Sequence, residues 1–256
     1  LSSGLLAQAN YFGSKVIGAD DTSFQNIPSP GPGNVDARRP NPRLSAIRTI
    51  HWGGWSIYHS MSLGLDKRLS HGLAASAKYT WSKSIDVASN PGPTFSETNF
   101  PQNVYNRRNE KALSSFDIRH RLVVSGSYQL PIWLSGTGWR RKIAEGWTLT
   151  TIASLQSGAP FTVNIPSDNA NVGAGPAQRP DLLRDPILSS GQTPERWFDT
   201  GAFALSAPFA FGNLGRNTLF TDGLQNVDFS ILKAIPIAES ASAEFRFEMF
   251  NLLNHA

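Results

Sequence analysis

The sequence predicts an all-β chain, an antiparallel transmembrane β-barrel, and three observations support this class. The charged fraction is 16% and the hydrophobic fraction 40%, both below the roughly 25% and 45–50% of average soluble domains. Apolar and polar residues alternate with period two in several separate runs, which is typical of strands with one buried face. The segments between the runs are alternately long and short, as in barrels with long extracellular loops and short periplasmic turns.

The clearest runs are 52–69 and 73–85. In both, the odd positions are mostly apolar and the even positions are mostly small or polar. The short connection Ser70-His71-Gly72 contains a glycine, so the two runs are predicted to form a β-hairpin. A weaker run at 5–13 comes before them and is expected to add a third antiparallel strand.

Four further runs complete about seven predicted strands, several of them longer than the mode of ~5–6 residues in globular proteins. They cover 119–130, 147–163, 227–235 and 242–254. In a meander, successive connections lie at opposite ends of the sheet. One end is therefore predicted to carry the long loops 14–51, 86–117 and 164–225, and the other the turns 70–72, 131–146 and 237–241.

Charged residues divide between the two predicted faces as a membrane wall requires. A Lys or Arg that faces lipid costs about 2–4 kcal/mol at the bilayer midplane and about 0–1 near the interface. The predicted lipid-facing charges, Lys67, Lys83 and Lys233, lie near strand ends, from which long side chains reach water. The predicted lumen-facing charges are Asp66, Lys78, Arg119, Arg121, Asp228, Glu244, Arg246 and Glu248.

Among the lumen charges, Asp228 is predicted to pair with Arg246 across the last two strands. The register of this pair is open, and the pair is either wall electrostatics or a contact for a plug or substrate. A second basic feature is the tripeptide Arg140-Arg141-Lys142 in a predicted turn. It either contacts anionic headgroups or is a solvated turn.

Tryptophan and tyrosine residues gather near the predicted strand ends, as expected for two interfacial belts. The belt at the long-loop end comprises Trp55, Tyr58, Tyr79 and Trp81, and the belt at the short-turn end comprises Tyr128, Trp133, Trp139 and Trp147.

No combination of residues predicts catalysis, so we expect a protein that is not an enzyme and has no cofactor and no metal site. The five histidines show no His-x-x-x-His spacing, and there is no cysteine to supply thiolate ligands. Gly31-Pro32-Gly33 and Gly173-Ala174-Gly175 lack the strand-before, helix-after context of phosphate loops. Arg119-His120-Arg121 is interpreted as wall charges rather than a catalytic group.

The net charge is +4, and no basic run exceeds three residues, so no nucleic-acid partner is expected. The long loops 86–117 and 164–225 are the expected functional surface, because loops of such length are usually functional or mobile. The sequence names no substrate-binding residue in them.

Four segments closely resemble TonB-dependent outer-membrane receptors, above all the Oar-like β-barrels common in Acidobacteria. They are SHGLAASAKYTWSKSID (70–86), FDIRHRLVVSGSYQLP (116–131), GWTLTTIASLQSGAPFTV (146–163) and AEFRFEMFNLLNHA (243–256). Loop patterns at 30–42 and 211–219 resemble the same group.

The resemblance implies that residues 1–256 are part of one 22-stranded barrel, whose plug and N-terminal domains lie outside this chain. It implies a receptor of the Gram-negative outer membrane that takes up a large or scarce nutrient. The implied partners are outer-membrane lipid, the TonB complex acting through N-terminal parts, and an unknown extracellular ligand. Other interpretations are a passive channel, a surface adhesion or matrix protein, and a soluble β-sandwich.

Overall fold

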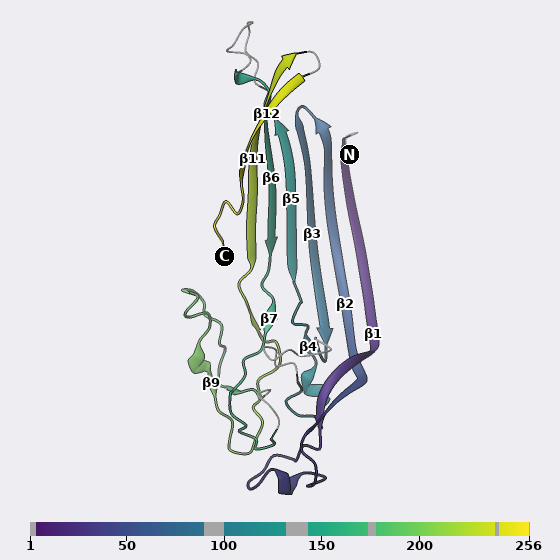
Figure 1. Ribbon diagram of the computed structural model, residues 1–256, viewed down its shortest axis with the longest axis vertical. Coiled ribbons are helices and arrows are strands. Elements are labelled where there is room, and N and C mark those ends of the chain that lie inside the picture. Colours follow the sequence, from purple (N-terminus) through teal and green to yellow (C-terminus); the bar gives the residue numbers. More distant parts are fainter. Residues whose placement is uncertain (1–3, 90–99, 132–142, 174–177, 239–240, 256) are drawn as a thin grey trace.

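The computed structural model describes residues 4–89, 100–131, 143–173, 178–238 and 241–255, which form one long antiparallel sheet with loops packed at one end (Figure 1). Its order, β1-β2-β3-β5-β6-β11-β12, is a meander in which each strand pairs with the next. This confirms the predicted seven-stranded antiparallel arrangement. Among the described residues, no helix has the length and apolar character to cross a membrane.

The long strands are β1 (Leu5–Gln25), β2 (Ile47–Ser70), β3 (Leu73–Asp86), β5 (His120–Gln129), β6 (Trp147–Gln156), β11 (Leu224–Ala238) and β12 (Ala241–Met249). The short elements are β4 (Ala112–Leu113), β7 (Pro160–Phe161), β8 (Asp181–Leu182), β9 (Phe203–Ala204), β10 (Leu219–Phe220) and the 3-10 turns η1 (Asp36–Arg38), η2 (Arg107–Glu110) and η3 (Thr200–Ala202). β4 extends the main sheet beside β3, and β7 with β10 and β8 with β9 form two small sheets.

The first hairpin is much longer than predicted. β1 and β2 have 21 and 24 residues and stay paired up to Gln25 opposite Ile47, so the predicted loop 14–51 is wrong and the connection is 26–46. Register shifts after Ile17 and Ala19 break the alternation. A membrane crossing needs only about 9–11 residues, so the outer part of this hairpin extends beyond the membrane. Burial does not alternate there, since the consecutive residues Asp21, Thr22 and Ser23 are all buried.

The predicted strand 147–163 is wrong in its second half, because β6 ends at Gln156 and β7 pairs with β10. At Gly158 the backbone passes so close to the loop that a Cβ would lie 1.8 Å from the Thr221 carbonyl oxygen. The chain leaves the sheet at this point. β11 is longer than predicted, and β12 ends at Met249 rather than residue 254, before Asn251 adopts a φ of 48°.

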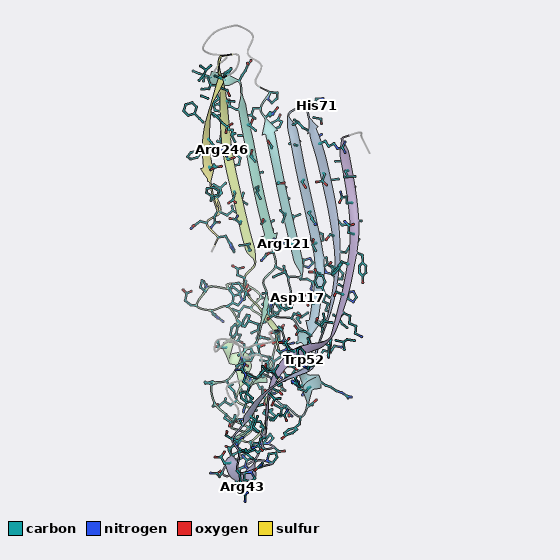
Figure 2. All side chains as sticks on the ribbon, turned by 45° about the vertical axis from the view of Figure 1, so that its right-hand side comes forward. Arg43, Trp52, His71, Asp117, Arg121 and Arg246 are labelled. Carbon is teal, nitrogen blue, oxygen red and sulfur yellow. The ribbon has the colours of Figure 1, made fainter. Side chains whose placement is uncertain are left out.

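The turn between β2 and β3 needs a left-handed backbone. His71 has a φ of 52° and Gly72 a φ of 78°, and a Cβ on Gly72 would lie 2.6 Å from the Gln129 carbonyl oxygen. Glycine is the residue that tolerates both conditions. His71 marks the short-turn end in Figure 2, and Arg43 lies at the opposite, long-loop end.

The strand register places residues of similar character opposite one another, in rows that run across the sheet. Leu65, Ala77, Val124, Ala153 and Val227 lie opposite one another in a single row across five strands. The next row, which points to the other side, begins with Asp66, Ser76 and Ser125. The sheet therefore has one apolar and one polar face, as expected for a wall between lipid and a lumen.

The small apolar core lies among the loops and beside the outer hairpin rather than along the sheet. Ile27, Ala170 and Val172 are buried together, and Phe24, Ala46, Val104 and Phe211 pack against them. The loops are therefore folded against one another.

Candidate functional site

Three loops meet at the long-loop end and are named here loop A (26–46), loop B (87–119) and loop C (157–223). Their described parts pack together into one body, the loop assembly (Figures 1 and 2). The long-loop prediction 164–225 corresponds closely to loop C, and 86–117 to loop B.

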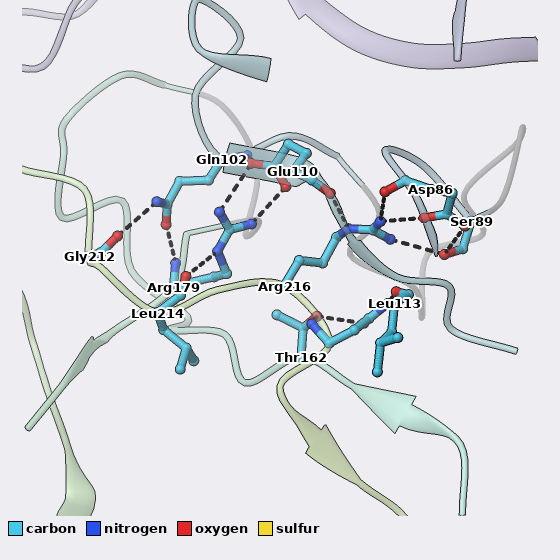
Figure 3. A network of polar contacts seen from close by, with 11 residues as sticks. Asp86, Ser89, Gln102, Glu110, Leu113, Thr162, Arg179, Gly212, Leu214 and Arg216 are labelled. Carbon is cyan, nitrogen blue, oxygen red and sulfur yellow. Dashed lines mark hydrogen bonds and ion pairs between the residues drawn. The ribbon is translucent and has the colours of Figure 1, made fainter. Parts of the chain in front are cut away.

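The centre of the loop assembly is a buried ion pair between loops B and C (Figure 3). The Arg179 guanidinium donates two hydrogen bonds to the Glu110 carboxylate, at 2.8 and 3.1 Å, and both side chains are at most 3% exposed. Arg179 Nε also donates to the Leu214 carbonyl oxygen at 2.8 Å. The fork geometry satisfies both charges, which is what a pair removed from water requires.

Arg216 extends this network to the wall of the sheet. Its guanidinium donates to the carbonyl oxygens of Glu110 and Asp86, both at 3.0 Å, to Ser89 Oγ at 2.9 Å and to the Asp86 carboxylate (Figure 3). Asp86 is the last residue of β3. Loop C is thereby fixed both to loop B and to the end of a wall strand.

Gln102 completes the contact between loops B and C. Its Nε2 donates to the Gly212 carbonyl oxygen at 2.9 Å and its Oε1 accepts from Arg179 N at 2.7 Å. A Cβ on Gly212 would lie 2.1 Å from the Arg179 carbonyl oxygen. This close backbone contact requires a glycine at position 212 of the motif at 211–219.

Loop A joins the assembly through polar contacts with loop C. Asn171 Nδ2 donates to the carbonyl oxygens of Gly31 and Gly33 at 2.9 and 2.8 Å, and Arg38 donates to Ser29 and Asn171 carbonyl oxygens. The glycines of 31–33 thus hold two loops together. Gly173 lies close to Val35, while Ala174 and Gly175 lie outside the described residues.

Loop B also contacts the outer part of the first hairpin. Arg107 in η2 forms an ion pair with Asp21 of β1, whose side chain is 1% exposed. Burial lowers the pKa of the Arg107 guanidinium, and the nearby Glu110 carboxylate opposes this shift.

A second Arg–carboxylate pair in loop C is open to solvent. Arg184 donates to Asp199 Oδ2 at 2.7 Å, with side chains 58% and 31% exposed. The hydrogen bond from Arg184, helped by one from the Gly201 backbone, lowers the pKa of the Asp199 carboxyl. This pair is a natural comparison for the buried one.

The loop assembly lies over the polar face of the sheet. Toward the end of β3, Ser82, Ser84 and Asp86 are buried, whereas Trp81 and Lys83, which point to the other side, are exposed. Ser84 N donates to Asp117 at 2.5 Å. The loops therefore fold inward at the mouth and leave the apolar face bare.

Arg119, His120 and Arg121 do not form one site. Arg119 pairs with Asp117 at 3.3 Å, while His120 lies opposite Trp81 on the apolar face, its Nδ1 2.7 Å from the Tyr79 hydroxyl. Among the described residues, no cluster of three or more His, Asp or Glu side chains could hold a metal ion.

The predicted Asp228–Arg246 pair is wrong. Register places Arg246 opposite Leu232, four positions along β11 from Asp228. Arg246 pairs with Glu244 and Glu248 of its own strand, at 3.0 and 3.6 Å, and Asp228 accepts from Asn251 N at 2.9 Å.

The belt prediction holds at the long-loop end except at Tyr58. Register places Trp81 and Tyr79 on the apolar face but Tyr58 opposite Ser84, on the polar face. Tyr58 differs because it occupies an even position of β2, and the even positions of this strand point to the polar face.

At the short-turn end, the lysines of the apolar face find partners within the protein. Lys233 lies 5.3 Å from the Trp147 ring centroid and donates to the Glu145 carbonyl oxygen, and Lys67 Nζ donates to Ser70 Oγ at 2.6 Å. Trp133, Trp139 and 140–142 lie outside the described residues.

An amphipathic antiparallel wall with folded loops over its polar face is the architecture of an outer-membrane β-barrel. The chain belongs to the family described as outer membrane beta barrel domain, which matches residues 1–256. The protein is therefore an outer-membrane protein of the all-β, barrel-forming class.

A solved structure supports the same fold. The outer membrane transporter YddB from Escherichia coli is similar over 100% of this chain, with a TM-score of 0.52 and 9% sequence identity. This chain spans 27% of that transporter. No curated protein matches the chain by sequence.

Proposed function

We propose that this chain is part of the barrel of a TonB-dependent, Oar-like transporter, and that its loop assembly binds a large or scarce nutrient before uptake. The observation that supports this most is the loop assembly itself, in which the buried Glu110–Arg179 pair joins loops B and C and the Arg216–Asp86 pair ties them to the end of β3. Porins keep an aqueous lumen, whereas 22-stranded transporters have a plugged one. An ordered layer of loops at the mouth suits a receptor better than an open channel.

In this proposal the chain acts without catalysis. The strands form about a third of a 22-stranded wall, and the plug and the parts that contact the TonB complex belong to other regions of the full protein. The similar outer membrane transporter is longer than this chain, which spans 27% of it.

The test uses the full-length protein in cells with and without a functional TonB complex. Uptake of radiolabelled iron chelates, vitamins and oligosaccharides is measured under limitation, and conductance of the purified protein is recorded in planar bilayers. We expect at least one compound to be accumulated only when TonB is present, and no steady open conductance. A large conductance that does not need TonB would favour a passive channel. Cell adhesion without any uptake would favour an adhesion protein.

A further inference from the structure

The apolar face carries an unusual set of cations just below the loop assembly. Lys15 on β1 lies opposite Ile57, two positions along β2 from His59, which lies opposite Lys83 on β3. Two positions further along, on the same face, one row contains Tyr11, Met61, Trp81 and His120. We name this set, together with Tyr79, Trp55 and Lys111, the outer-face patch.

The cations of the patch have no acidic partner among the described residues. Lys15, Lys83 and Lys111 are exposed, and the rows that hold Lys15 and Lys83 contain no Asp or Glu. Lys111 Nζ lies 5.9 Å from the Trp55 ring centroid, which places this loop B lysine beside the same face. At the short-turn end, by contrast, Lys67 and Lys233 have acceptors within the protein.

Two tyrosine–histidine pairs give the patch a fixed frame. The Tyr11 hydroxyl lies 2.6 Å from His59 Nδ1, and the Tyr79 hydroxyl lies 2.7 Å from His120 Nδ1. The rings of each pair are stacked, with interplanar angles of 21° and 22°. Because Nδ1 is engaged in both pairs, Nε2 is the nitrogen left to contact a ligand.

The spacing suits a ligand that carries more than one anionic group. Strands lie about 4.8 Å apart and residues rise about 3.3 Å along a strand, so the Lys15 and Lys83 backbones are about 12 Å apart. Long, flexible lysine side chains reach well beyond their own backbone positions. Two phosphates on one headgroup would meet both ammonium groups.

We infer that the outer-face patch binds a lipid with a phosphorylated headgroup in the outer leaflet. The face is apolar below the patch and meets lipid tails there, while the aromatic rings mark the headgroup level. Cations at that depth attract anionic headgroups. A lipid is therefore the partner we infer, because its tails pack against the apolar rows while its phosphates pair with the lysines.

The test uses the full-length protein in non-ionic detergent and native mass spectrometry. The probes are a glycolipid with two headgroup phosphates, the same lipid after dephosphorylation, and inorganic phosphate alone. We expect binding of the phosphorylated lipid to fall about fivefold for each of Lys15→Gln, Lys83→Gln and Lys111→Gln. Lys67→Gln, on the same face at the other end, and Lys78→Gln, on the polar face, are the matched controls and should leave binding unchanged.

Three results would overturn the inference. They are equal binding of the dephosphorylated lipid, equal loss in the Lys67→Gln control, or displacement of the lipid by inorganic phosphate alone. Heat-modifiable gel mobility verifies that each variant is folded. Lys111 lies on a loop, so Lys111→Gln keeps the test decisive even where a strand variant fails to fold.

Discussion

Arg216 and Asp86 form a buried ion pair although they stand 130 residues apart in the chain. Their side chains are 3% and 2% exposed. The pair ties the longest loop to the end of a wall strand, on the polar face. The position of the loop assembly is therefore set by the wall itself.

Glu110→Gln should loosen the loop assembly, because it leaves the Arg179 guanidinium buried without an anion. Removing one partner of a buried pair costs about 3–5 kcal/mol. We expect faster proteolytic cleavage within loops B and C of the full-length protein in detergent, while the heat-modifiable gel shift of the barrel persists.

The matched control is Asp199→Asn, which weakens an exposed Arg–carboxylate pair in the same loop. Such pairs contribute about 0–1 kcal/mol, and asparagine still caps η3. Cleavage rates in this variant should stay near those of the wild type. Equal sensitivity of the two variants would contradict a special role for the buried pair.

The Asp199 carboxyl should titrate at a lower pH than an ordinary aspartate, mainly because Arg184 hydrogen-bonds its ionised form. A folded-state pKa below the unfolded value gives a stabilisation that is complete above the unfolded pKa and is lost as pH falls through the folded pKa. Carbon-13 NMR of the labelled carboxyl should therefore report a pKa below about 3.9. Arg184→Met should raise this pKa, and Arg196→Met, which removes a more minor influence, should raise it less.

Val124→Arg should impair the barrel, because Val124 lies in the apolar row across five strands. An arginine on the lipid face near the bilayer midplane costs about 2–4 kcal/mol. The neighbouring variant Ser125→Arg points to the polar face, in the row of Asp66, and should be tolerated. Urea unfolding of the refolded full-length protein in vesicles measures both, and the opposite order would reverse the assignment of the faces.

Gly72→Ala should destabilise the short-turn end. The position has a φ of 78°, and a Cβ there would meet the Gln129 carbonyl oxygen at 2.6 Å. The left-handed backbone alone costs about 1–2 kcal/mol for other residues. Gly64→Ala is the control, since its nearest neighbour would be Gln8 Cβ at 3.7 Å. The urea midpoint should fall for the first variant and not for the second.

The sequence predicted the wall well, and the reason lies in strand parity. Around Leu65, Ala77 and Val124 one face meets lipid and the other a lumen, so alternation survives and the faces can be assigned from the residues. Past Ile17 and before Trp52 the first hairpin extends beyond the membrane, and Asp21, Thr22 and Ser23 are buried in succession. No selection for alternation acts there, and the true strand ends could not be seen.

The loop assembly could not be predicted for a different reason. Glu110, Arg179 and Arg216 look like solvated loop charges in the sequence, because their partners lie about 70 to 130 residues away. Only the folded chain shows that they are buried.

The ion pair between Arg216 and Asp86 also depends on how the strands of the wall pair during assembly. A slip of β3 by one residue would turn Asp86 toward the lipid side and leave Arg216 without its carboxylate. The closed arrangement of the loops therefore depends on correct strand pairing. A misregistered copy would lack this anchor, and its loops would be cut faster by proteases.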